Sequence, residues 1–361
     1  MNRFKQILTG VILIPFLFIS CQKENNNDQL TAGLLHGAFI SNEGLYGAGN
    51  GSVTYFNSDS DKVTSNLYYQ ANGRQAGDVV QSFCVYGNKG FLAVNNSGKL
   101  EVLDMKSFRT LGVVAATYPR YFLPVDSTKG YLTNGIYGGV YVVDLKNYKI
   151  TNTIAVGVEP ENLIRVGNYV YVANGNYGND NTVSVIDMST DKVVKTITLS
   201  DGTVNLVADA NNNVWVLCEG KVVYDASWTK IIDETDSKLV CLTNNQISKS
   251  FVIGHTGDGF NPVSIAISQD KKTVYFAEKD GIYQMPVSST TIPSKPFIST
   301  STTSYSFEPG TVGVNPANGD IYVLQVTSYA ANGKAYVFNK SGVLKTSFDT
   351  GIGPNGVTFN N

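Results

Sequence analysis

The segment YVYVANGNYGNDNTVSVIDMSTDKVVKTI, residues 169–197, holds three runs of β-branched and aromatic residues separated by Asn, Gly and Asp. The runs are Tyr169–Ala173, Asn181–Asp187 and Val193–Ile197. Side chains of this kind favour strands, and Asn and Gly tolerate the positive φ that tight turns require. The segment therefore predicts consecutive antiparallel strands joined by short turns.

The same pattern recurs every 40 to 56 residues along the chain, which is close to the length of one four-stranded propeller blade. We therefore expect an all-β fold, a seven-bladed β-propeller. An eighth blade would need a further repeat between Gly220 and Lys238, and that excursion is too short. Seven runs align as the third strands of the blades: Val53–Asn57, Glu101–Asp104, Tyr141–Asp144, Ser184–Asp187, Leu239–Thr243, Ile282–Pro286 and Ala335–Asn339.

The last run, Pro354–Phe359, matches the first strand of other blades, such as Pro160–Ile164, but no further strands follow it. We expect it to join the N-terminal runs His36–Ile40 and Val53–Phe56 in one blade. The ring is then closed by N- and C-terminal strands in one blade, which removes the sheet edge that an open ring would expose. Residues 34–361 are predicted to form this single domain.

The first twenty residues have the composition of an export signal. Arg3 and Lys5 precede an apolar stretch of about thirteen residues, which is too short to span a bilayer as a helix. Ser20-Cys21 at its end resembles a bacterial lipobox, so Cys21 is the expected lipidation site. Residues 1–20 are therefore predicted to be a lipoprotein signal peptide, and the polar residues 21–33 a lipidated flexible tether. A protein anchored by lipid in the outer membrane and exposed at the cell surface is the expected localisation.

Charge and cysteine content narrow the function classes. There are 27 Lys and Arg against 29 Asp and Glu, so no basic field is available to bind nucleic acid. Beyond Cys21 the chain has Cys84, Cys218 and Cys241, which allow at most one disulfide. A bridge between Cys218 and Cys241 and a role as small buried hydrophobic residues both remain open.

Enzyme activity is not expected. The chain has only two histidines, His36 and His255, and neither a Gly-x-Ser-x-Gly elbow, a P-loop nor a dinucleotide fingerprint. No metal site and no cofactor are predicted. The alternative is a calcium-dependent hydrolase, whose cation would be held by channel carboxylates with Asn groups. Its candidate carboxylates are Glu43, Glu161, Glu219, Glu278 and Glu308.

Residues 169–197 also resemble the YVTN-type propellers of bacterial and archaeal surfaces. Segments nearer the N-terminus are similar to a Bacteroidetes lipoprotein family that includes the cobalamin-capturing surface propellers called BtuG. The resemblance implies a corrinoid bound on one face and handed to an outer-membrane transporter. The segments that carry it are Phe39–Gly44, Gly49–Tyr55, Ala71–Arg74, Gly77–Ser82, Val94–Lys99 and Pro119–Tyr121.

One rim of the ring is the expected binding site, because the loops leading into each inner strand meet there with the loops joining second and third strands. A corrinoid or other amphipathic ligand needs aromatic surface and groups that bind amides. The alternative is that Asn and Tyr serve turns and ordinary surface, and that the arginines form ion pairs. The candidates are Asn42, Glu43, Tyr46, Asn72, Arg74, Asn95, Tyr118, Arg120, Tyr121, Asn134, Tyr137, Glu161, Asn162, Asn174, Tyr177, Phe260, Asn261 and Tyr329.

These observations favour a surface lipoprotein that binds a small nutrient, most specifically cobalamin or another corrinoid, for an outer-membrane transporter. The alternative from another class is a cell-surface interaction or adhesion propeller that binds a protein or a glycan.

Overall fold

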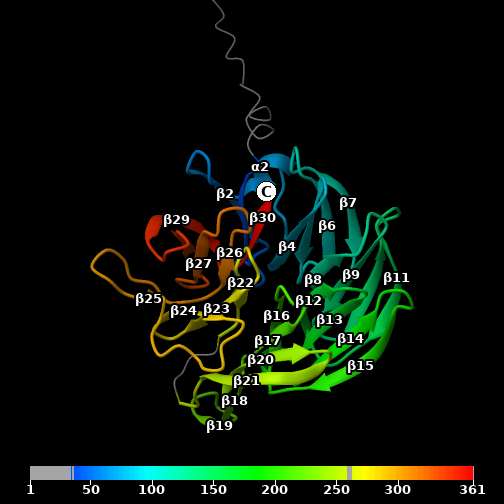
Figure 1. Ribbon diagram of the computed structural model, residues 1–361. Coiled ribbons are helices and arrows are strands. Elements are labelled where there is room, and N and C mark those ends of the chain that lie inside the picture. Colours follow the sequence, from blue (N-terminus) through cyan, green and yellow to red (C-terminus); the bar gives the residue numbers. More distant parts are fainter. Residues whose placement is uncertain (1–33, 35, 258–261, 361) are drawn as a thin grey trace, which may run out of the picture.

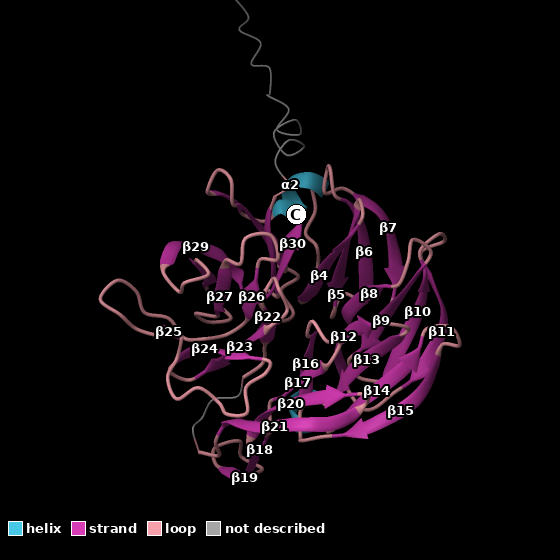
Figure 2. Ribbon diagram, viewed as in Figure 1, coloured by secondary structure: helices cyan, strands magenta, loops and turns pink. Residues whose placement is uncertain are grey.

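The computed structural model describes residues 34, 36–257 and 262–360, which form seven four-stranded antiparallel sheets arranged in a ring (Figure 1). Besides strands, the described residues contain the α-helix α2 (Leu67–Asn72) and the 3-10 turn η1 (Asn176–Gly178) (Figure 2). The predicted seven-bladed propeller is confirmed. No helix in the described part of the chain is long and apolar enough to cross a membrane.

Five blades each use four strands that are consecutive in the chain, running from the axis outward. Blade 2 consists of β4 (Val80–Tyr86), β5 (Lys89–Val94), β6 (Lys99–Asp104) and β7 (Thr110–Ala115), and blade 3 of β8 (Pro119–Pro124), β9 (Lys129–Asn134), β10 (Gly139–Asp144) and β11 (Lys149–Ala155). Blade 4 consists of β12 (Pro160–Val166), β13 (Tyr169–Asn174), β14 (Thr182–Asp187) and β15 (Lys192–Thr198). Blade 6 consists of β22 (Ile265–Ile267), β23 (Thr273–Glu278), β24 (Gly281–Pro286) and β25 (Ile298–Ser299), and blade 7 of β26 (Val312–Val314), β27 (Ile321–Gln325), β28 (Asn332–Phe338) and β29 (Leu344–Ile352).

Blade 1 combines the two ends of the chain. Its inner strand β30 (Pro354–Asn360) pairs antiparallel with β1 (Gly37–Asn42), and β2 (Ser52–Asn57) and β3 (Lys62–Thr64) follow outward. On its other sides β30 lies next to the inner strands β4 and β26 of the neighbouring blades. The predicted closure of the ring by both termini is confirmed.

Blade 5 contains an insertion. Its sheet is formed by β16 (Thr203–Ala208), β17 (Val214–Cys218), β20 (Ser237–Thr243) and β21 (Gln246–Gly254). Between β17 and β20 the chain makes a separate two-stranded hairpin of β18 (Lys221–Tyr224) and β19 (Ile231–Thr235). The excursion is therefore an elaborated loop rather than an eighth blade.

The middle strands of the blades are buried on both faces. In β17, Trp215 and Leu217 pack with residues of blade 6, whereas Val214, Val216 and Cys218 pack with residues of blade 4. This explains why β17 is apolar throughout instead of alternating, since each sheet lies between two neighbours. The outer strand β29 of blade 7 does alternate between half-buried and exposed residues over 344–349, as expected where only one face is covered.

The cysteines in the described part of the chain form no disulfide. Cys84, Cys218 and Cys241 are free thiols in the structure. Cys218 faces blade 4 and Cys241 faces blade 6, so their side chains leave opposite faces of the same sheet. Two Cβ atoms that point apart cannot be bridged without moving the backbone. Of the two alternatives left open by the sequence, the Cys218–Cys241 bridge is therefore excluded, and both residues are buried apolar side chains.

The acidic or amide residue that ends many third strands has a structural role. The Oδ1 atoms of Asp104, Asp144 and Asp187 accept hydrogen bonds from the N–H two residues later, at 2.8 to 3.0 Å. Asn57 and Asn339 do the same at 2.9 Å. These side chains hold the turn that leads to the outer strand. Bonding to Asn147 and Ser189, respectively, lowers the pKa of Asp144 and Asp187.

We predict that ring closure by β30 controls stability. A chain ending at Gly353 lacks this strand, which exposes the edge of β1 and the faces of blades 2 and 7. Its thermal unfolding should lose cooperativity, with the midpoint lowered by more than about 10 °C in calorimetry. As a control, replacing residues 222–234 with a short Gly-Ser linker keeps all seven sheets and should shift the midpoint by only a few degrees. An unchanged transition in the truncated chain would contradict the prediction.

Candidate functional site

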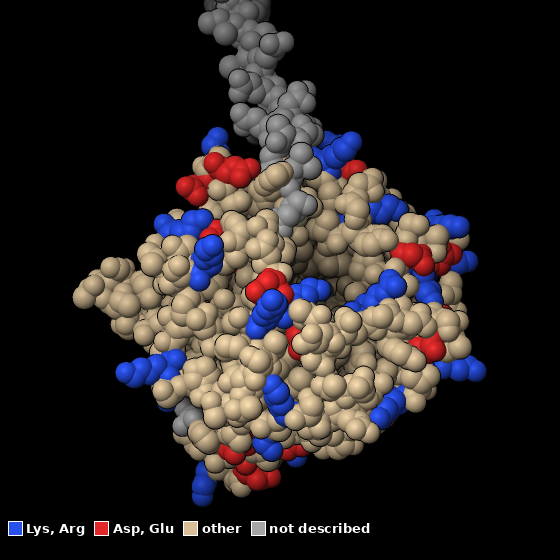
Figure 3. Space-filling view, viewed as in Figure 1, with Lys and Arg blue, Asp and Glu red and all other residues tan. Residues whose placement is uncertain are grey.

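A cavity of about 710 Å³ follows the axis of the ring and is lined by residues from all seven inner strands. Its volume is within the range of roughly 300 to 1,000 Å³ that is typical of small-molecule sites. Figure 3 shows a molecular face that is hollowed near its centre. One end of the cavity is formed by Glu43, Gln81, Arg120, Glu161 and Glu219, and we call this end the mouth.

An ion pair between neighbouring blades occupies the mouth. The guanidinium of Arg120 in β8 lies 2.6 Å from the Glu161 carboxylate in β12, and it donates to Gln81 Oε1 at 2.7 Å. Burial raises the pKa of Glu161, although Arg120 opposes this effect. Burial lowers the pKa of Arg120, but Glu161, with smaller contributions from Tyr121 and Tyr177, outweighs this effect and the pKa is raised. The pair is therefore poorly solvated.

Two further carboxyl groups complete the mouth. Glu43 Oε1 accepts a hydrogen bond from Asn355 Nδ2 at 3.1 Å, and burial raises the pKa of Glu43. Glu219 Oε1 accepts one from the backbone N–H of Tyr177 at 2.6 Å. Burial raises the pKa of Glu219 to about 8, with a further contribution from Glu161. This carboxyl group is therefore largely protonated at neutral pH.

The mouth combines hydrogen-bond donors and acceptors that are largely shielded from water. Three carboxyl groups face a single guanidinium, and burial favours the neutral form of each carboxyl. Of the carboxylates considered for a calcium site, the structure brings together Glu43, Glu161 and Glu219 at the cavity. Among the described residues, no group of three or more His, Cys, Asp or Glu side chains could hold a metal ion. The arrangement suits neutral polar groups such as amides and hydroxyls.

Proline and local bulges aim the side chains of the mouth. Arg120, Glu161 and Asn355 each follow a proline that starts an inner strand, where no ladder N–H is needed. The pairing register shifts at this end in blades 1 to 5, for example between Pro119 and Phe122. Such bulges bend a strand and redirect its side chains, so residue 120 can reach across to the next blade.

An aromatic rim lies on the face of the ring where the mouth opens. Five aromatic side chains are 54 to 78% exposed, more than any other aromatic side chain of the described residues. Each lies on the loop between the second and third strands of a different blade, so all five project on the same face. Tyr177 and Tyr329 line the cavity itself. The aromatic rim consists of Tyr46, Tyr137, Tyr177, Trp228 and Tyr329.

The predicted asparagines at the ends of second strands are mostly buried and serve the blades. Asn42 donates to the side chains of Ser52 and Thr54, and Asn174 donates to Thr182 and Ser184. Asn134 donates to Tyr141, and its Oδ1 caps the N–H groups of residues 136 and 137. These three residues hold second strands, third strands and loops together. This agrees with the alternative that the asparagines serve turns instead of a ligand. Asn95 is half-buried and donates to the carbonyl of Pro119 at 3.1 Å.

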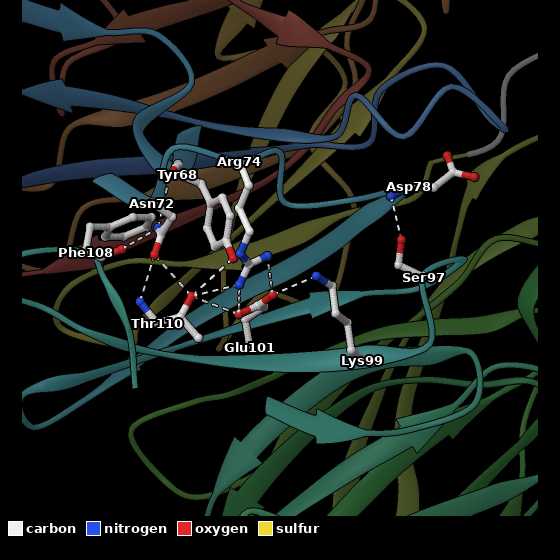
Figure 4. Close-up of polar contacts among 9 residues, drawn as sticks. All are labelled: Tyr68, Asn72, Arg74, Asp78, Ser97, Lys99, Glu101, Phe108 and Thr110. Carbon is white, nitrogen blue, oxygen red and sulfur yellow. Dashed lines mark hydrogen bonds and ion pairs between the residues drawn. The ribbon is translucent and has the colours of Figure 1, made fainter. Parts of the chain in front are cut away.

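Asn72 and Arg74 lie outside the cavity lining. Figure 4 shows both in a polar network on α2 and blade 2. Arg74 makes two bonds to the carboxylate of Glu101, at 3.0 and 3.1 Å, and Lys99 lies 2.6 Å from the same group. Burial raises the pKa of Glu101, but these cations outweigh it and the pKa is lowered. The predicted Asn72 and Arg74 therefore anchor α2 instead of facing the mouth.

The remaining predicted residues fall into three groups. Tyr121 and Asn162 line the cavity, and burial raises the pKa of Tyr121 to about 12. Tyr118 lies beside Tyr137, with 6.4 Å between the ring centroids. Phe260 and Asn261 lie outside the described residues.

Gln81 and Asn355 were absent from the predicted set, although both line the cavity. Asn355 could have been found, because Pro354-Asn355 aligns with Pro160-Glu161 and Pro119-Arg120. The sequence predicts Glu219 only as a candidate calcium ligand. Its contact with Tyr177 joins two blades, and no sequence pattern predicts such a contact.

A family model described as Domain of unknown function (DUF5074) matches residues 36–350, which is most of the chain. No curated protein has a detectable match to the sequence.

Solved structures support the fold. A quinonprotein alcohol dehydrogenase-like protein from Bacteroides thetaiotaomicron is 16% identical, with a TM-score of 0.66 over 91% of this chain and 79% of that one. Apo AztD from Citrobacter koseri is 13% identical, with a TM-score of 0.54 over 90% and 97% of the two chains. The Cps50 (Swd1) β-propeller domain of Myceliophteria thermophila is 11% identical, with a TM-score of 0.58 over 81% and 91%. At these identities the similarity concerns the fold alone.

We predict that E161Q is strongly destabilising. It leaves the Arg120 charge buried without its partner, which should lower the free energy of unfolding by about 3 to 5 kcal/mol. The exposed ion pair of Lys334 and Asp349 gives the control. D349N should change the free energy of unfolding by less than about 1 kcal/mol. Urea denaturation at pH 7 measures both. If both substitutions changed the free energy of unfolding equally, the buried Arg120–Glu161 pair would contribute no more to stability than an exposed pair, and the prediction would fail.

We also predict a pH-dependent contribution from Glu219. Its pKa is raised from 4.5 to about 8 on folding, so the folded state binds the proton more tightly. The stabilisation is complete below about pH 4.5 and is lost as the pH rises through about 8. The difference in unfolding free energy between wild type and E219Q should therefore shift in favour of E219Q from pH 5 to 9. A constant difference across that range would contradict the raised pKa.

Proposed function

The chain belongs to the family described as Domain of unknown function (DUF5074), and we propose that this member captures a small molecule at the mouth of its central channel. The observation that carries the proposal is the aromatic rim on the face where the partly desolvated polar mouth opens. Exposed aromatic side chains are unfavourable in water, and five of them on one face mark a binding surface. The cavity below offers room for an inserted group of the ligand.

A corrinoid is the proposed ligand class. Its macrocycle would lie across the mouth on aromatic side chains such as Tyr177 and Tyr329, with its amide arms directed towards polar groups. Gln81, Arg120 and Asn162 supply donors and acceptors for amides. The resemblance of the N-terminal segments to cobalamin-capturing propellers supports this choice over other amphipathic molecules.

The proposed setting is the outer membrane. The lipobox-like Ser20-Cys21 supports lipidation at Cys21, with residues 21–33 as the tether. A propeller anchored in this way at the cell surface would hold its ligand for an outer-membrane transporter. We propose binding and transfer without catalysis.

A second candidate function is adhesion or another interaction with a protein or glycan. It is favoured by the position of Trp228, which stacks on Tyr224 with 5.7 Å between ring centroids. Both residues lie on the β18–β19 hairpin, and neither lines the cavity. An aromatic surface that extends beyond the cavity fits a partner larger than a single small molecule.

Calorimetric titration with cyanocobalamin tests the proposal. The wild type should bind at micromolar protein, and Y177A and Y329A should each weaken binding about five- to tenfold, because each removes ring contact worth about 1 kcal/mol or more. The control is Y86A, at the far end of blade 2, which should leave the affinity unchanged. Absence of heat with the wild type would rule out the corrinoid. Capture of a protein or glycan that depends on Trp228 but not on Tyr177 would then favour the second candidate.

A further inference from the structure

Tyr177 has an unusual backbone for a cavity-lining residue. Its φ of 58° and ψ of 24° place it in the left-handed region, which is unfavourable for a residue with a Cβ atom. The side chain is nevertheless strongly exposed at the mouth. A strained residue with an exposed ring needs surrounding contacts that hold its position.

The loop of Tyr177 is packed tightly at its two glycines. A Cβ atom at Gly175 would lie 2.1 Å from the carbonyl oxygen of Asp180, and one at Gly178 would lie 2.6 Å from Cβ of Lys221. Lys221 begins the hairpin of blade 5, so the loop of blade 4 rests against the neighbouring blade. The backbone path around Tyr177 therefore depends on blade 5.

The direct contact from blade 5 is Glu219. Its carboxylate accepts the N–H of Tyr177 at 2.6 Å, and the N–H of Gly178 also bonds to it. In blade 3 the equivalent ring, Tyr137, has its N–H capped at 3.2 Å by Asn134 from its own blade. Blade 4 uses a residue from another blade and an ionisable group, and hydrogen bonds to a charged acceptor are the stronger kind.

We propose that Glu219 is a positioning residue for ligand binding, whose carboxyl group fixes the Tyr177 loop so that the tyrosine ring stands over the mouth. The ligand contact rests on the proposed function, whereas the positioning of the loop does not. Glu219 is itself nearly buried, and its stem packs against Gly202, where a Cβ atom would lie 2.7 Å from Cγ.

The charged surroundings of Glu219 make the positioning depend on pH. Glu161 disfavours its ionised form and Arg120 favours it, while Asp201 and Lys221 border it on the adjacent loop and hairpin. Ionisation, centred at about pH 8, gives the carboxylate that accepts both N–H groups most strongly. The Tyr177 loop should therefore be held more firmly at pH 9 than at pH 6.

Hydrogen exchange detected by mass spectrometry tests the positioning without a ligand. At pH 9, peptides that cover residues 175–180 should exchange about tenfold faster in E219A than in wild type, since a charge-assisted bond is lost. E219Q should show an intermediate rate and, relative to wild type, little loss of protection at pH 6. E308Q is the matched control, because Glu308 is an exposed carboxylate in a blade 7 loop. It should exchange as wild type in this segment.

Cyanocobalamin titrations at pH 6 and pH 9 test the ligand contact. The wild type should bind about threefold to tenfold more tightly at pH 9, and E219Q should bind with the same affinity at both pH values. Y177A should remove the pH dependence as well, because the positioned ring is absent. E308Q should retain the wild-type response.

The two arms separate the two hypotheses. Unchanged exchange of residues 175–180 in folded E219A and E219Q overturns the positioning role, whether or not cyanocobalamin binds. Faster exchange with no binding by the wild type supports the positioning role and rejects the corrinoid proposal. Wild-type binding with a pH response that persists in both E219Q and Y177A overturns the link between Glu219 and ligand affinity.

Discussion

The burial of each blade between two neighbours is the constraint on which the structure depends. A single four-stranded sheet has two apolar faces, and neither can be covered within the blade. Trp215 and Val216 in the same strand show the consequence, because they contribute to the cores on opposite sides of blade 5. No blade can then be omitted, so the first and last must meet. The pairing of β1 with β30 satisfies this requirement with strands from the two ends of the chain.

Because the blades pack on one another through their strands, the loops on the face of the mouth take no part in the core. Second and third strands are fixed by packing, while the loops between them carry side chains that the fold does not need, such as Tyr46 and Trp228. The inner strands connect the two regions. Their first residues are released from regular pairing by proline or by a bulge, and these are the positions that hold Arg120 and Glu161. A repeated scaffold can thus present a mouth that differs from blade to blade.

The fold was predictable because its determinants are local and repeated. Each blade restates the same spacing of strand and turn, and the Asp or Asn that ends a third strand has the same bonds in several blades. The site was only partly predictable. The loop tyrosines lie where the sequence predicts them, but Asn42 and Asn174, predicted for the rim, brace the strands. Arg74 was misplaced because the short helix α2 has no periodic signal, and its partner Glu101 lies on another strand.

The polarity of the mouth does not serve stability, since desolvated carboxyl groups oppose folding and apolar residues would fill the channel more favourably. Its distribution is also uneven. Blades 1 to 5 place Glu43, Gln81, Arg120, Glu161 and Glu219 at the mouth, whereas blades 6 and 7 contribute Val263, Val326, Tyr329 and the backbone near Gly310. One arc of the ring is therefore polar and the other largely apolar. A ring of seven similar blades with such an asymmetry can bind an amphipathic molecule in one orientation, and a radially symmetric channel would lack this selectivity.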